Sequence, residues 1–165
     1  MSNKNLILGT INVKKVELVE AMGKKYEVNY DLPEIVETKK SKEALIKINY
    51  LLDNMDFESN YTIGSPIELL AYSEILKSKN KITGSEFNKI RSKVFEYFKN
   101  TKLNYVILIF CKKDVNDFDM DLHYKICKYL RILTGLSSFH DGYIELEDLS
   151  VESNASYLKQ QFKID

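Results

Sequence analysis

The feature that most constrains this chain is a run of seven apolar residues, Tyr105 to Cys111 (Tyr-Val-Ile-Leu-Ile-Phe-Cys). The run is short, continuous, and rich in β-branched and aromatic residues, which is typical of a strand covered on both faces rather than of a half-exposed one. It therefore predicts a central buried strand in the middle of a sheet. Other elements must cover that sheet, and 44% hydrophobic content in 165 residues is enough to build such a core.

Two capping boxes place helices before this strand. Ser65-Pro66-Ile67-Glu68 combines an N-cap serine, a proline at the first helical position and a glutamate that can reach back to the cap. Thr83 and Glu86 have the same spacing, and the apolar stripe Phe87, Ile90, Val94 and Phe98 follows them. An earlier helix opens at Ser41, since Leu45, Ile48, Leu52 and Met55 step by three and four.

The N-terminal segment favours strands. Residues 6–13 are β-rich, and residues 25–32 alternate between apolar and polar side chains before Pro33. The segment between them, residues 15–22, fits either a third strand of a meander or a short helix capped by Gly23, which would make the N-terminus βαβ.

The later chain predicts a fourth helix and an acidic strand. Leu122, Ile126, Leu130 and Leu133 share one helical face that Gly135 ends, and an Asp-Gly turn then precedes alternating residues 143–149. Residues 154–162 suggest a short last helix. We therefore predict one α+β domain over residues 1–165, with N-terminal strands, three helices, a central buried strand, a fourth helix and an acidic C-terminal hairpin or strand in a mixed or antiparallel sheet.

Formal charge balances at 24 basic and 24 acidic residues, which removes the overall attraction on which most nucleic-acid binders depend. The one basic cluster comprises Lys77, Lys79, Lys81, Lys89, Arg91 and Lys93. No helix-turn-helix or RNP-like motif accompanies it, so a solvated helix face is the preferred interpretation. Nucleic-acid binding through residues 77–93 is the less favoured alternative and would require a steep salt dependence. Residues 114–165 carry 5 basic and 10 acidic residues, a net charge of −5.

Metal and cofactor motifs are missing from the sequence. The carboxylates Asp114, Asp117, Asp119 and Asp121 fail the EF-hand spacing, because Leu122 and Lys128 stand where Gly and Glu belong. His123 and Cys127 share a helix side but provide only two zinc ligands. No export signal or spanning segment is visible, and the two cysteines, Cys111 and Cys127, suit a reducing compartment, so we expect a cytoplasmic protein without cofactor, metal or membrane.

The acidic segment carries the leading functional hypothesis. Tyrosine offers rigid contact area and carboxylates steer a basic partner, so the sequence favours a non-catalytic protein-binding module, such as a small bacterial or phage inhibitor or immunity protein that neutralises a basic toxin or nuclease. The expected contact residues are Asp141, Tyr143, Glu145, Glu147, Asp148 and Glu152. The alternative is a hydrolase or nuclease whose site forms around His140 and Asp141 with carboxylates from Glu145 or Asp119.

Overall fold

The computed structural model describes residues 5–11, 13–55, 61–99, 101, 103, 105–110, 115–136, 144–147 and 150–162. Its strands are β1 (Asn5–Gly9), β2 (Glu27–Val28), β3 (Tyr61–Ile63), β4 (Tyr105–Phe110) and β5 (Ile144–Glu147). Its helices are α1 (Lys15–Ala21), α2 (Leu32–Val36), α3 (Ser41–Asn54), α4 (Pro66–Ser78), α5 (Gly84–Lys99), α6 (Asp117–Leu136) and α7 (Val151–Phe162). The strands form a sheet in the order β2-β3-β1-β4-β5.

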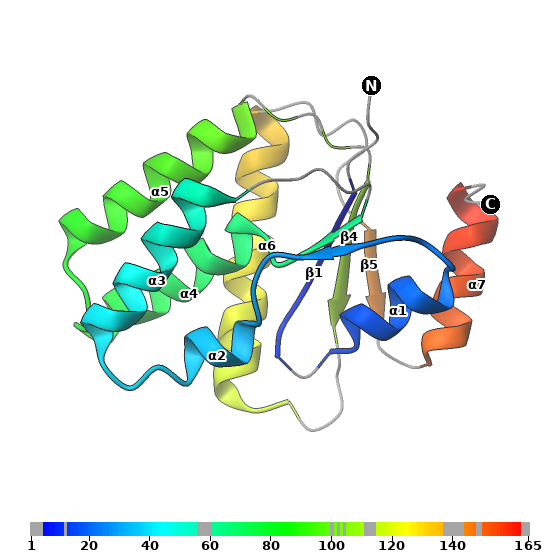
Figure 1. Ribbon diagram of the computed structural model, residues 1–165, viewed down its shortest axis with the longest axis horizontal. Coiled ribbons are helices and arrows are strands. Elements are labelled where there is room, and N and C mark those ends of the chain that lie inside the picture. Colours follow the sequence, from blue (N-terminus) through cyan, green and yellow to red (C-terminus); the bar gives the residue numbers. More distant parts are fainter. Residues whose placement is uncertain are drawn as a thin grey trace.

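Helices cover both faces of this sheet (Figure 1). Leu6 and Leu8 of β1 belong to the core formed with α2 to α6, whereas Ile7 between them packs in the core that α1 and α7 cover. All five residues of β1 are buried. The alternation of two cores along one strand explains why the strand reads as a continuous apolar run.

The prediction of a mixed or antiparallel sheet is wrong, because every strand pair in the described residues is parallel. At least one helix follows each of β1 to β4 and returns the chain to the edge where the next strand begins, which is how parallel neighbours are connected. Residues 15–22 accordingly contain the helix α1, so the βαβ alternative to the meander is the observed one. Only Glu27 and Val28 of the predicted third strand pair in the sheet.

Other predictions need smaller corrections. The apolar run at residues 105–110 is an interior strand with neighbours on both sides, but β1 holds the middle position. The predicted helices omitted α2, which begins beside Pro33, and α6 continues through Gly135 to Leu136. The short last helix is present as α7 and begins at Val151 rather than at residue 154. The acidic strand β5 exists, and it pairs with β4 in parallel rather than in a hairpin. The combination of helices and strands in one fold is confirmed.

Both capping boxes are confirmed. Ser65 accepts a hydrogen bond from the Ile67 amide at 3.1 Å, and its own amide donates to Glu68 at 3.2 Å. At the start of α5 the Thr83 amide donates to Glu86 at 2.8 Å, and the Glu86 amide donates back to Thr83 at 3.1 Å. No helix in the described part of the chain is long and apolar enough to cross a membrane.

Candidate functional site

The parallel sheet directs attention to the end of β1. The helix that follows β1 lies on one face, while α4 and α6, which follow its neighbours β3 and β4, lie on the other. The carboxyl ends of these strands lie toward the bottom of Figure 1. From there the chain continues to one face of the sheet after β1 and to the other face after β3 and β4. In open parallel sheets such a switch point leaves a crevice where ligands bind.

Glu68 lies under this crevice, in the first turn of α4, with a side chain that is 0% exposed. Four donors surround its carboxylate. Oε2 accepts from the Gly9 amide at 3.2 Å and from Lys15 Nζ at 2.8 Å. Oε1 accepts from the Ser65 amide at 3.2 Å, and the Tyr30 hydroxyl, whose single proton it shares with the Ser65 carbonyl, lies 3.3 Å away. These contacts occupy the carboxylate, so Glu68 holds other groups in position and has little capacity left for a ligand.

Lys15 is the member of the pair that keeps a hydrogen for another partner. Its Nζ donates to the Gly9 carbonyl at 3.1 Å and to Glu68 at 2.8 Å, and its side chain is 11% exposed. An ammonium group has three hydrogens, so two of them are used and one remains for another acceptor. Because α1 and α4 lie on opposite faces of the sheet, the ion pair crosses the end of β1, and Lys15 is also one of the residues that line a cavity there.

Tyr30 completes the cluster from the segment after β2. Its hydroxyl donates to the Ser65 carbonyl at 2.6 Å and lies 3.3 Å from Glu68. Burial and the neighbouring Glu68 carboxylate raise the pKa of the tyrosine well above its ordinary value, so the hydroxyl stays protonated. The ring also packs against the backbone of Gly64, where a Cβ atom would lie 3.0 Å from the Tyr30 nitrogen.

A small cavity of about 190 Å³ opens beside Lys15. Its lining combines aliphatic walls with one cation and two exposed carboxylates, and comprises Ile11, Val13, Lys15, Val16, Glu17, Asp31, Leu32 and Pro33. Known ligand cavities for drug-sized molecules run from roughly 300 to 1,000 Å³, so this one suits a smaller molecule. It offers a donor at Lys15, acceptors at Glu17 and Asp31, and apolar surface between them.

The structure describes only part of the predicted contact surface. Asp141, Tyr143 and Asp148 lie outside the described residues, as does His140 of the alternative site. The backbone of Glu145 and Glu147 belongs to β5, in register with Leu108 and Phe110 of β4. Glu152 is exposed in the first turn of α7. The protein-binding surface therefore stays a prediction.

The remaining candidates lie around the start of α6. His123 is buried with its ring stacked on Phe110 at a centroid distance of 3.9 Å, and Cys127 Sγ lies 3.6 Å from its Nε2. Asp119 is buried at the third position of α6. Desolvation raises its pKa, and the opposing hydrogen bond with Asn116 only partly offsets this increase. Among the described residues, no three His, Cys, Asp or Glu side chains are grouped as metal ligands would be.

The sequence did contain one overlooked signal for the site. Glu68 stands between Ile67 and the pair Leu69 and Leu70, so three apolar neighbours surround an acidic residue, and buried glutamates are rare unless paired. We interpreted it only as a capping residue. Its partner Lys15 is 53 residues away and has no distinguishing pattern of its own.

Comparison with known proteins gives no further guide. No family model, no curated protein and no solved structure matches this chain.

Proposed function

We propose that this chain binds a small zwitterionic metabolite, such as a free amino acid, in the crevice at the carboxyl end of β1. The observation that carries the proposal is the fixed Lys15 ammonium group, which keeps one hydrogen beside a cavity at the switch point of a parallel sheet. Binding, rather than catalysis, is the activity that these residues support.

The chemistry of the lining selects the ligand class. A ligand carboxylate can accept a charge-assisted hydrogen bond from Lys15, and an ammonium group can donate to Asp31 or Glu17, both of which are exposed. An aliphatic side chain can pack against Val16 and Leu32. A molecule with charge of one sign only would leave part of this lining unmatched, whereas a zwitterion satisfies both signs.

Replacing Lys15 by Met should abolish ligand binding, because the ammonium group is lost. The free variant should also be less stable by about 3 to 5 kcal/mol, because Glu68 is left as an unpaired buried charge, so the shift in Tm caused by the ligand is compared within each variant. The measurement is thermal unfolding of the protein with each of the twenty amino acids, and with sugars of similar size as a neutral comparison. A ligand at a hundred times its Kd stabilises a protein by about 2.7 kcal/mol, which raises Tm by roughly 5 to 10 °C for a chain of this length.

Lys14→Met is the matched control, since Lys14 is the exposed neighbour in sequence and does not line the cavity. We expect the wild type and Lys14→Met to show the same amino-acid shift and Lys15→Met to show none. Stabilisation by neutral sugars alone, or an amino-acid shift that survives in Lys15→Met, would contradict the proposal.

Protein binding through the acidic C-terminal segment is the second candidate, and the exposure of Glu152 next to the edge strand β5 favours it. If a basic partner protein is captured from the native cell, Glu152→Lys should weaken its binding at low salt by roughly tenfold through charge repulsion. Glu34→Lys, an exposed site on α2, is the control. Equal affinity of both variants for the partner would show that the acidic segment is not the binding surface.

A cytoplasmic location stays a prediction.

A further inference from the structure

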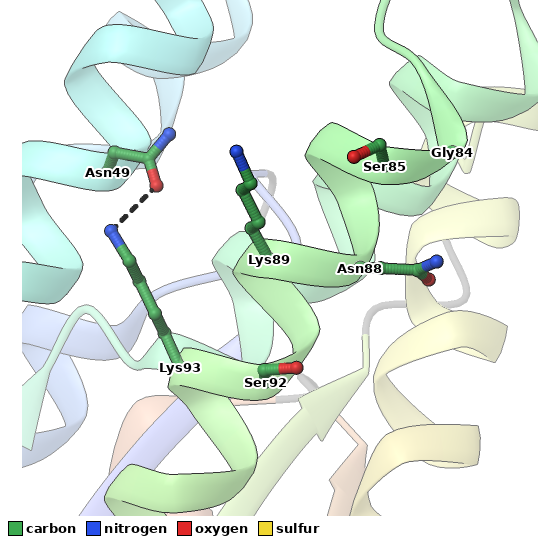
Figure 2. A pocket seen from close by; sticks show the side chains of 7 residues that line it. All are labelled: Asn49, Gly84, Ser85, Asn88, Lys89, Ser92 and Lys93. Atoms are coloured by element: carbon green, nitrogen blue, oxygen red, sulfur yellow. Dashed lines mark hydrogen bonds between the residues drawn. The ribbon is translucent and has the colours of Figure 1, made fainter.

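A groove lined by polar and charged residues lies between α3 and α5 (Figure 2). Figure 1 shows these two helices on the other side of the molecule from α1. It has a volume of about 740 Å³. Its lining contains no acidic and no aromatic residue and comprises Asn49, Gly84, Ser85, Asn88, Lys89, Ser92 and Lys93. Asparagine, serine and lysine all carry hydrogen-bond donors, so every lining side chain can donate to an acceptor.

Helical spacing accounts for this composition. Ser85, Lys89 and Lys93 are four residues apart along α5 and form one row of its outer surface. Figure 2 shows Lys89 and Lys93 extending from α5 toward α3. Phe87 and Ile90 on another side of α5 are buried in the core. The lysines of the groove are therefore not needed for packing α5 against the rest of the protein.

A second hollow of about 420 Å³ adjoins the groove at Gly84, which lines both. The turn from α4 to α5 forms it, with Lys77, Asn80, Lys81, Ile82, Thr83, Gly84 and Glu86 around it. Together the two hollows contain four lysines, Lys77, Lys81, Lys89 and Lys93, and a single carboxylate, Glu86. We call these two hollows the lysine groove.

The structure divides the basic cluster that the sequence contains. Lys79 lies over the ring of Phe118 and Arg91 over the ring of Phe95, and neither lines the groove. Lys93 donates to Asn49 at 2.9 Å and pairs with Asp53 at 2.9 Å. Lys81 and Lys89 are exposed, and no hydrogen bond or ion pair joins their ammonium groups to another described residue. These two ammonium groups are therefore available to a partner.

We propose that the lysine groove binds the phosphodiester backbone of a nucleic acid. Phosphate oxygens are acceptors only, and they match a lining in which four lysines and several amide and hydroxyl donors outnumber a single carboxylate, Glu86. The groove has no aromatic side chain on which a base could stack, so the contacts are with the backbone and carry no sequence preference. The balanced charge of the whole chain does not oppose this, because exposed charges act over about 10 Å in 0.1 M salt.

The test is fluorescence anisotropy with labelled 20-nucleotide single-stranded and duplex DNA of random sequence between 25 and 200 mM salt. The two available lysines, Lys81 and Lys89, should give a slope of log K against log salt of about −1.5, from roughly 0.7 to 0.9 per phosphate. In Lys81→Gln/Lys89→Gln the slope should approach zero, and affinity at 50 mM salt should drop by roughly tenfold or more. Neither residue contributes to the core, so the variant should fold normally.

Lys25→Gln/Lys159→Gln is the matched control, because it removes the same charge from exposed positions after α1 and on α7, across the sheet. We expect its DNA affinity to stay within about twofold of wild type. Three results would overturn the proposal: no binding to either DNA at 25 mM salt, equal losses in the two double variants, or equally tight binding of polyglutamate of matched charge. The crevice of β1 takes no part in this experiment, so its outcome is independent of the proposed function.

Discussion

Glu68→Gln is expected to lower the free energy of unfolding by about 3 to 5 kcal/mol, the usual cost of removing one partner from a buried ion pair. The Gln side chain keeps one acceptor oxygen. Its NH₂ group replaces the other carboxylate oxygen and faces the donors that this oxygen accepts from in the wild-type protein. Either the Gly9 amide and Lys15 lose their acceptor, or the Ser65 amide and Tyr30 do. Urea unfolding at neutral pH measures the difference.

Glu86→Gln provides an unusually close control, because Glu86 has the same capping role at the start of α5. Its carboxylate accepts only from the Thr83 amide, at a solvent-accessible site without an ion pair in the described residues. Loss of such a cap contribution should cost about 1 kcal/mol or less. If the two variants cost the same, Glu68 would be an ordinary capping residue, and the ion pair would not organise the end of β1.

Gly64→Ala should destabilise the protein by about 3 kcal/mol, from two separate causes. Gly64 has φ +91°, where a side chain is strained by roughly 1 to 2 kcal/mol. An added Cβ would also lie 3.0 Å from the backbone nitrogen of Tyr30, which the sheet and the Ser65 contact hold in place. Overpacking against an immobile group adds a comparable cost.

Gly23→Ala separates these two causes. Gly23 has φ +69°, and a Cβ there would meet nothing within 4 Å, so only the conformational strain remains. We expect it to cost about 1 kcal/mol in the same urea experiment. Equal destabilisation by the two alanines would show that the Gly64 backbone has room beside Tyr30, contrary to the close packing described for the crevice.

Local signals in the sequence were sufficient for several helices. The Ser65 and Thr83 caps and the apolar stripe after Ser41 depend on contacts within a few residues, so they could be predicted without knowledge of the fold. Sheet direction could not, because it depends on whether residues 15–22 form a helix, and their apolar spacing suits both structures. The three-residue strand β3 is too short to show any period and was missed.

The candidate site was hidden for a related reason. Lys15 and Glu68 become neighbours only because β1 and β3 pair in parallel and send their helices to opposite faces. An antiparallel sheet has no switch point of this kind, so the predicted topology could not indicate a crevice at the end of β1. The excess of acidic residues in residues 114–165 indicates a charged surface, but the charge of a segment does not show where a ligand crevice lies.

The most direct test of the proposed function is an NMR titration of ¹⁵N-labelled protein with the amino acid that stabilises it most. The expected result is a set of amide shift changes at the end of β1 and in the adjoining elements, centred on Gly9, Ile11, Lys15, Val16 and Asp31, and absent in Lys15→Met. Shift changes confined to other parts of the molecule, or no saturable change with any of the twenty amino acids, would contradict a ligand site at the carboxyl end of β1.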